Sequence, residues 1–205
     1  MALVEKIKAN PSLKKIAHWC LIPTNEYRPR LWVKLLLNPF KHKKGKGSKI
    51  CRRTRIDVLP FNHFELGAYS TIEDFSTVNN GVGDVLIGEK TIIGLGNVVI
   101  GPVSIGNNVM LAQNIVISGL NHGYQDVSKP PAEQAVFTQK ITICDDVWVG
   151  ANSVITAGVK IGKHSVIGAG SIVTKDIPEY VVAAGNPARI LKKYNFETKI
   201  WEKSD

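Results

Sequence analysis

Residues 87–118, IGEKTIIGLGNVVIGPVSIGNNVMLAQNIVIS, repeat one pattern every six residues. An aliphatic residue recurs at each step, and the residue after it is usually small. The aliphatic positions are Ile87, Ile93, Val99, Ile105, Leu111 and Ile117, and their followers are Gly88, Gly94, Ile100, Gly106, Ala112 and Ser118. The pattern resumes at Ile143, Val149, Ile155, Ile161, Ile167 and Val173, followed by Cys144, Gly150, Thr156, Gly162, Gly168 and Thr174. A weaker early run is Leu66, Ile72 and Val78. We call these fifteen aliphatic residues the guide positions.

A period of six fits neither the 3.6-residue repeat of a helix nor the two-residue alternation of an isolated strand. It fits a chain that turns a corner after each short strand, so that three strands complete a triangular coil. The guide residues then point inward and stack on their copies in coils about 4.8 Å away. The small followers let the backbone bend at a corner, where glycine can adopt a positive φ. The sequence therefore predicts an all-β fold, a parallel β-helix solenoid, over residues 56–190.

The composition indicates one domain built of many turns. The 205 residues are 44% hydrophobic but only 7% aromatic, and 18 of them are glycine. The three cysteines form no CxxC pair, which disfavours a disulfide framework or a zinc cluster and favours a reducing compartment. The longest apolar run near the N-terminus, 35–37, is far too short for a membrane span. We therefore expect a cytoplasmic protein.

Residues 1–55 are expected to form a helical and basic segment beside the first coil. Ser12 is placed to cap a helix through LKKIAHWCLI, and Pro29 suits the first turn of a second helix through RLWVKLLL. We expect these helices to pack on the end of the coils. The alternative is an interfacial membrane helix, because Trp32 and several leucines lie close to basic residues.

Positive charge is concentrated in residues 41–55, KHKKGKGSKICRRTR, which contain eight Lys or Arg and no acidic residue in a chain of net charge +9. Nucleic acid, acidic lipid or an anionic substrate would each suit such a run. It equally suits a solvated connector. Neither an RNA-binding signature nor interleaved aromatic residues accompany it, so nucleic acid is not an expected partner.

The regular spacing is broken between Ile117 and Ile143, which are 26 residues apart. Because 26 is not a multiple of six, we expect a loop insertion at residues 119–140. Its polar residues and the pair Pro130 and Pro131 keep it outside the core. Beyond the last repeat, residues 191–205 are expected to form a short C-terminal helix that closes the stack.

His122 is the first candidate for chemistry, because it lies at the start of the inserted loop. A neutral imidazole there can accept a proton from a substrate hydroxyl. By position alone, it can equally be an ordinary polar loop residue. The histidines do not supply the set of three that a zinc site in this fold needs, so no metal is expected. Cys144 occupies a small-residue position and no serine lies in a nucleophile elbow, which favours direct attack by the acceptor.

Three further segments contain residues that a β-helix alone does not require. They are DDVWVGANSVITAGVKIGKHSVIGAGSIVTKDIP (145–178), VVAAGNPARILKK (181–193) and NH (121–122). With the repeat, they resemble the hexapeptide-repeat acetyltransferases, which include maltose, galactoside, xenobiotic and capsular-polysaccharide O-acetyltransferases. The resemblance covers about residues 65–192. It implies a left-handed coil, acetyl-CoA as the acyl donor without a metal, and a homotrimer with its active sites between subunits.

The resemblance also implies roles for individual residues. His122 matches the general base of the family, which removes the acceptor proton while backbone amides stabilise the tetrahedral oxyanion. Trp148 matches an aromatic residue that lines the acceptor cleft, although it can also be a packed corner residue. The positions that match the coenzyme site are Gly150, Ala151 and Ala169 at the pantetheine arm, and Thr174, Lys175 and Arg189 near the nucleotide end, where cations suit phosphates.

Two departures bear on the acceptor. The maltose and galactoside branches hold the acceptor with an Asn before the histidine loop, whereas Asn97 here is off the expected position. The first 50 residues also lack the helical motif of the maltose branch. Because the loop NHGYQDVSKPPAEQ looks more like that of polysaccharide-associated enzymes, we expect a sugar acceptor.

Two other functions remain open from the sequence. The first is a non-catalytic β-helix that binds an anionic glycan or a membrane surface through residues 41–55. The second is an acyltransferase that uses a longer acyl donor.

Overall fold

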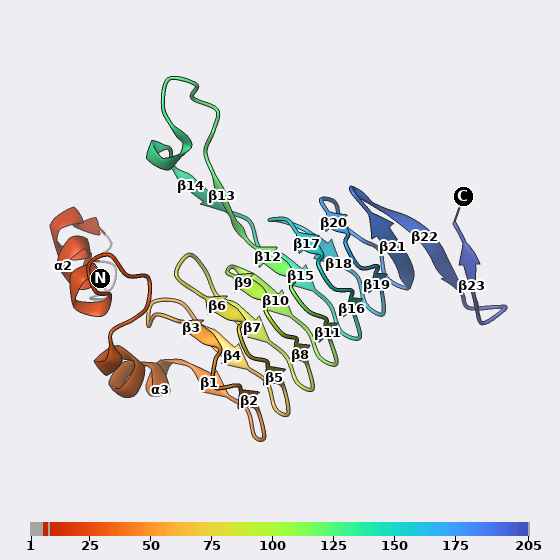
Figure 1. Cartoon of the computed structure of the whole chain (residues 1–205), viewed down its shortest axis with the longest axis horizontal. Coiled ribbons are helices and arrows are strands. Elements are labelled where there is room, and N and C mark those ends of the chain that lie inside the picture. Colours follow the sequence, from red (N-terminus) through yellow and green to blue (C-terminus); the bar gives the residue numbers. More distant parts are fainter. Residues whose placement is uncertain (1–5, 8, 205) are drawn as a thin grey trace.

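A computed structural model, which describes residues 6, 7 and 9–204, shows a stack of triangular coils with helices at one end and an antiparallel extension at the other (Figure 1). Three parallel sheets form the sides of the stack. Side 1 contains β1 (Lys43–Lys44), β4 (Phe64–Leu66), β7 (Val85–Ile87), β10 (Val103–Ile105), β15 (Ile141–Ile143) and β18 (Lys160–Ile161). Side 2 contains β2 (Lys49–Ile50), β5 (Thr71–Ile72), β8 (Ile92–Ile93), β11 (Met110–Leu111), β16 (Trp148–Val149), β19 (Val166–Ile167) and β21 (Val181–Gly185). Side 3 contains β3 (Arg55–Asp57), β6 (Thr77–Asn79), β9 (Val98–Ile100), β12 (Val116–Ser118), β17 (Val154–Ile155) and β20 (Ile172–Val173).

The guide positions form the core, as the sequence predicted. All fifteen are at most 2% exposed. They stack in register from coil to coil, so that on side 3 Ile117 lies between Val99 and Ile155. The parallel β-helix prediction is therefore confirmed.

The small followers have a different role from the one expected. Gly94 and Gly150 are not at positive φ. Instead, a Cβ at Gly94 would lie 2.6 Å from the carbonyl oxygen of Ala112 in the next coil, too close for any side chain. The positive φ falls three residues after the guide position, as at Asn108 (53°) and Asn152 (59°), and asparagine tolerates this conformation. Close contact between coils, and not the corner itself, selects the small residue.

A second inward position, four residues after a guide position, often holds a buried polar side chain. The Ser76 hydroxyl donates to the Gly94 carbonyl (2.8 Å) and accepts from the Asn97 N–H (3.2 Å) in the next coil. Buried polar groups of this kind are stable only when hydrogen-bonded, and here each links one coil to the next. The residues at this position with 0% exposure are Ser70, Ser76, Thr91, Asn97, Ser153, Ser165 and Ser171.

The N-terminal helices are present but are not those expected in detail. Helix α2 (Pro11–Leu21) begins after Asn10, and not at Ser12, because the Asn10 side chain accepts from two backbone N–H groups and Pro11 follows it. The second helical segment consists of the π-helix η1 (Val33–Leu37) and α3 (Asn38–Lys41). No residue of α2 is buried.

The basic run is not a connector. Residues from Lys43 to Asp57 form the first coil through β1, β2 and β3, within the segment expected to be helical. Ile50 and Ile56 lie six residues apart and pair in register with the guide residues Ile72 and Val78 of the next coil. Lys43 and Lys49 lie in register with the outward residues Glu65 and Thr71, whereas Lys44 lies in register with the buried Leu66. The many charged residues therefore concealed a repeat that continues at Ile50 and Ile56.

Between β12 and β15 the chain forms an arm that projects from the stack (Figure 1). Its two strands, β13 (Leu120–His122) and β14 (Val136–Thr138), pair antiparallel. A short 3-10 helix, η2 (Pro131–Glu133), lies towards its tip. At the base, Gln139 N–H donates to the Gly119 carbonyl (2.9 Å), and Gly158 N–H donates to the Gln139 carbonyl (3.2 Å).

The prediction of a helix at residues 191–205 is wrong. Strands β22 (Ala188–Asn195) and β23 (Ile200–Lys203) extend side 2 beyond β21 as an antiparallel sheet. The last coil leaves the edge of β21 unpaired, and the chain reverses to cover it. Tyr194 lies opposite Trp201, with ring centroids 5.4 Å apart, a cross-strand aromatic pair that stabilises the hairpin.

No helix among the described residues combines the length and apolar character needed to cross a bilayer.

We expect Ile117→Ala to lower the free energy of unfolding by about 2–5 kcal/mol, because it leaves a cavity between two packed coils. The matched control is Val116→Ala on the same strand, whose side chain points outward and is 38% exposed; its expected cost is about 1 kcal/mol or less. Chemical denaturation of both variants measures the difference. Equal losses would contradict the inward stacking of the guide positions.

We also expect stability to fall as the pH is lowered because of His42. Burial, and then repulsion from His63, lower the pKa of His42 from its ordinary value of 6.5. Both of its ring nitrogens are buried without a hydrogen-bond partner. The unfolded chain therefore binds a proton that the folded chain excludes as the pH falls below 6.5.

His42→Leu removes this titration, so its unfolding midpoint should drop less than that of the wild type between about pH 7.5 and about pH 5.5. His164→Gln, at an exposed corner far along the chain, is the control. Parallel drops in wild type and His42→Leu would show that His42 is not responsible.

Candidate functional site

The predicted site residues lie on two different edges of the triangular stack. We call the corner between side 2 and side 3 edge 2/3, and the corner between side 3 and side 1 edge 3/1. Gly150, Ala151 and Ala169 lie on edge 2/3, directly after strands β16 and β19. The arm that carries His122 leaves the stack at edge 3/1, between β12 and β15. Within one chain, side 3 separates the two groups.

Edge 2/3 is narrow because its residues have little or no side chain. Gly150 is buried, and a Cβ on it would lie 2.5 Å from the Ala169 nitrogen in the next coil. The Ala151 carbonyl accepts from the Gly170 N–H at 2.8 Å. The N–H groups of Ala151 and Ala169 have no acceptor within the part of the chain that the structure describes. The edge thus carries backbone amides that the described residues leave unpaired.

Arg189 lies beside the same edge. It is an exposed residue of β22 and pairs with Ala184 of β21. Ala184 lies over Gly168, since a Cβ on Gly168 would lie 2.8 Å from the Ala184 Cβ. The structure therefore brings the arginine to the edge that carries Ala169.

Thr174 and Lys175 are not at that edge. They follow β20 and form the exposed corner of the last coil at edge 3/1. The Asp176 carboxylate accepts from the Lys160 N–H at 2.8 Å, which holds this corner against β18. The sequence grouped these residues with the coenzyme positions, but β20 lies between them and Ala169 in the same chain.

His122 is an exposed residue at the end of β13, paired with Val136. The next residue, Gly123, donates its N–H to the Ala135 carbonyl at 2.9 Å, so the arm is held as a hairpin at this level. The imidazole is exposed and makes no hydrogen bond within the described part of the chain.

Trp148 is neither packed nor at a corner, which excludes the alternative reading of this residue. It points outward from β16 and is 51% exposed. On side 2 it lies in register with Met110, which in turn lies in register with Ile92. These three exposed side chains form an apolar stripe. In the sequence, the stripe corresponds to large apolar residues directly before the guide positions Ile93, Leu111 and Val149.

Asn97 serves the core and not an acceptor. Its side-chain amide donates to the Ala112 carbonyl (2.8 Å), and its oxygen accepts from the Ile115 N–H (2.5 Å). The residue is fully buried. Because its side chain makes these two hydrogen bonds inside the coil, Asn97 does not correspond to the Asn that holds the acceptor in the maltose and galactoside branches.

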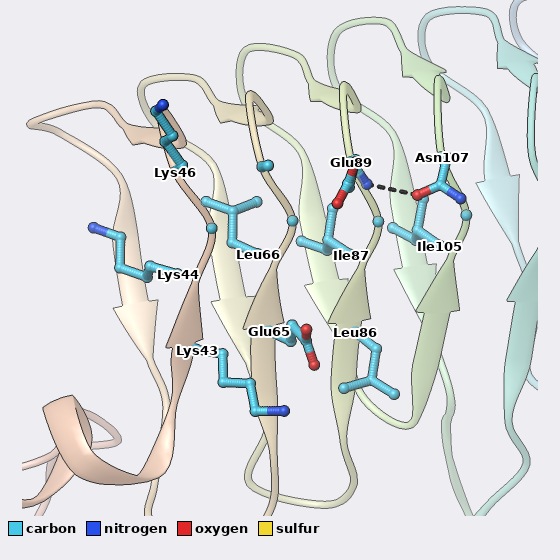
Figure 2. A pocket seen from close by; sticks show the side chains of 15 residues that line it. Lys43, Lys44, Lys46, Glu65, Leu66, Leu86, Ile87, Glu89, Ile105 and Asn107 are labelled. Carbon is cyan, nitrogen blue, oxygen red and sulfur yellow. Dashed lines mark hydrogen bonds between the residues drawn. The ribbon is translucent and has the colours of Figure 1, made fainter.

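A hollow of about 800 Å³ lies on side 1 near the first coils (Figure 2). Lys43, Lys44 and Lys46 line it together with Glu65 and Glu89. Its charge is mixed, and none of the predicted site residues lines it. Among the described residues, no group of three or more His, Cys, Asp or Glu side chains is placed to hold a metal ion.

Comparisons with known proteins agree with the repeat. The family profile described as "Bacterial transferase hexapeptide (six repeats)" matches residues 140–175, and the one described as "Hexapeptide repeat of succinyl-transferase" matches residues 84–118.

The chain is also similar to named enzymes. It is 47% identical over 97 residues to the galactoside O-acetyltransferase of Escherichia coli (strain K12), covering 47% of each chain. It is 44% identical over 94 residues to that of Lactococcus lactis subsp. lactis (strain IL1403), covering 45% of this chain and 44% of the relative. The chain thus matches about half the length of these curated relatives.

A structural likeness covers more of the chain. The crystal structure of a maltose O-acetyltransferase from Clostridium difficile 630 aligns with a TM-score of 0.53 and 26% identity, over 91% of this chain and 87% of that one. Together with the two profile matches and the coils, this likeness shows a hexapeptide-repeat β-helix that is similar to the acetyltransferases of this fold.

Proposed function

We propose that this protein is an acetyltransferase that moves an acetyl group from acetyl-CoA to a hydroxyl group of a sugar or another small acceptor. The observation that carries the proposal is an unpaired imidazole, His122, on an arm inserted into coils whose edge 2/3 presents unpaired amides. The similarity of the repeat region to galactoside O-acetyltransferases supports the chemistry and the class of acceptor.

His122 is the proposed general base. It removes the proton of the acceptor hydroxyl, and the oxygen then attacks the thioester carbonyl directly. A backbone N–H stabilises the negative charge that develops on the carbonyl oxygen. When the intermediate collapses, the thiolate of the coenzyme leaves and takes up a proton. This route needs neither a covalent intermediate nor a metal.

Edge 2/3 is the proposed site of the pantetheine arm. That arm contains two amide groups, which match the free N–H groups of Ala151 and Ala169. The lack of side chain at Gly150 allows a close approach to the backbone. Arg189 beside this edge would pair with phosphate groups, for which a guanidinium is well suited.

We propose that two subunits build each site. In one chain, side 3 separates His122 from edge 2/3, whereas a neighbouring copy can bring its arm against this edge. In a cyclic homotrimer, each subunit places its arm against edge 2/3 of one neighbour, so all three sites are built in the same way. Thr174 and Lys175, which share edge 3/1 with the arm, then also face the neighbour's edge 2/3. Trp148 on side 2 would line the acceptor cleft.

A cytoplasmic location is part of the proposal. It is supported by the cysteines, all three of which, Cys20, Cys51 and Cys144, are free thiols.

His122→Ala should lower kcat by about 10²–10⁴-fold while acetyl-CoA binding is retained, because only proton transfer is lost. Lys175→Ala should instead weaken coenzyme binding with a smaller effect on kcat. Thiol release against a panel of sugars and calorimetric titration of acetyl-CoA measure the two effects. His164→Ala, an exposed histidine outside the arm, is the control. A chain that binds no acetyl-CoA would point to the non-catalytic β-helix.

A subunit-mixing experiment tests the shared site. Ala169→Trp should block edge 2/3, and His122→Ala removes the base, so each variant alone should be inactive. When the two variants are co-expressed in equal amounts, a site is active only if its arm comes from an Ala169→Trp chain and its edge 2/3 from a His122→Ala chain. Random mixing satisfies this at about one quarter of the sites, so about one quarter of wild-type turnover should return. No recovery in assemblies shown to contain both variants would place the complete site within one chain.

A further inference from the structure

The N-terminal end of the stack carries an apolar surface that no part of the described chain covers. It is formed by η1, α3 and the residues just before them. The exposed fractions are 70% for Leu31, 41% for Trp32, 63% for Leu35, 62% for Leu36 and 88% for Phe40. We call these five residues the apolar patch.

The apolar patch is held in place by its opposite face. Val33 is fully buried, and the Asn38 side-chain amide donates to the Val58 carbonyl at 3.0 Å. These contacts attach the helical segment to the first coil and direct the patch away from the core. The apolar patch is therefore exposed although the segment that carries it is packed on the first coil.

Helix α2 lies at the same end of the stack and also exposes apolar side chains. Its Leu13, Ile16 and Trp19 are 44%, 58% and 62% exposed. Its polar residues include Lys14 and Lys15, so this helix is also both apolar and basic. Figure 1 shows it at the same end of the stack as η1 and α3, opposite the C-terminal strands.

The surroundings of the apolar patch are strongly basic. Residues 27–56 contain eleven of the chain's 26 Lys and Arg residues and no Asp or Glu. In the first coil, Lys43, Lys44 and Lys46 project from the surface (Figure 2). Several acids offset part of this charge: Asp57 pairs with Arg55 at 2.6 Å, Glu65 lies in register with Lys43, and the Asp74 carboxylate accepts from the Arg53 N–H at 2.8 Å.

We propose that this end of the protein docks on an anionic lipid bilayer. Leucine, tryptophan and phenylalanine side chains enter the boundary between headgroups and acyl chains, while lysine and arginine pair with lipid phosphates. A second copy of this chain fits less well, because joining the same end of two molecules would bring two positive surfaces together. The helices lie on the membrane and do not cross it. The proposal does not depend on the catalytic one.

The test is flotation of the full-length protein with vesicles. Protein should float with vesicles of phosphatidylcholine and phosphatidylglycerol, but not with phosphatidylcholine alone, and about 0.5 M salt should weaken binding because it screens the lysines. Leu35→Ser with Phe40→Ser should reduce the partition coefficient at least about tenfold. The matched control is Phe196→Ser with Ile200→Ser, exposed residues at the other end of the stack.

Charge reversal gives a second line of evidence. Lys43→Glu with Lys46→Glu should abolish flotation, whereas Lys192→Glu with Lys203→Glu should not. Circular dichroism and sedimentation velocity check that each variant keeps its fold and assembly.

Absence of flotation by the wild type overturns the proposal, as does binding that the change at Leu35 and Phe40 leaves unaltered. If that change instead dissociates the assembly, the apolar patch is a contact between subunits and the membrane proposal is wrong.

Discussion

The structure depends on the contact between successive coils. Each coil lies one strand spacing from the next, with backbone hydrogen bonds along all three sides and aliphatic residues stacked inside. This contact leaves no room for a side chain where two backbones cross, which is why glycine or alanine follows many guide positions. It also requires that a polar residue inside the coil be satisfied by the neighbouring coil, as Ser76 and Asn97 are.

The same contact explains where chemistry can be placed. The interior is filled, so a functional group must lie on a side, on an edge or on an insertion. Edge 2/3 supplies backbone amides because its side chains are small, and the arm supplies an imidazole because it leaves the coil. Neither edge alone holds both groups. A site that needs both therefore favours an assembly in which one chain meets another.

The two ends of the stack differ from its middle, because a coil at an end has one face without a neighbouring coil. At the C-terminal end, β22 and β23 cover the edge of β21, and aromatic pairs such as Tyr194 with Trp201 stabilise the hairpin. At the N-terminal end, Val33 and Asn38 attach a helical segment whose other face remains apolar. The first end is closed by the chain itself, whereas the second offers a surface to a partner.

Sequence alone was sufficient for the β-helix and its core residues, because a six-residue period reflects local chain geometry that repeats whatever surrounds it. His122 and the glycine corner were also proposed from the sequence, through their place in that repeat and through the family resemblance. The sequence failed where the outcome depends on neighbours. A helix was expected at residues 191–205, but β22 and β23 are strands, because the open edge of β21 is available to pair. The sequence left the basic run open between a connector and a binding surface. It forms the first coil, because its charged residues do not prevent Ile50 and Ile56 from stacking beneath the next coil. The division of the candidate site between two edges was likewise decided only by the tertiary structure, since the number of residues between two positions does not tell which side of a triangular coil lies between them.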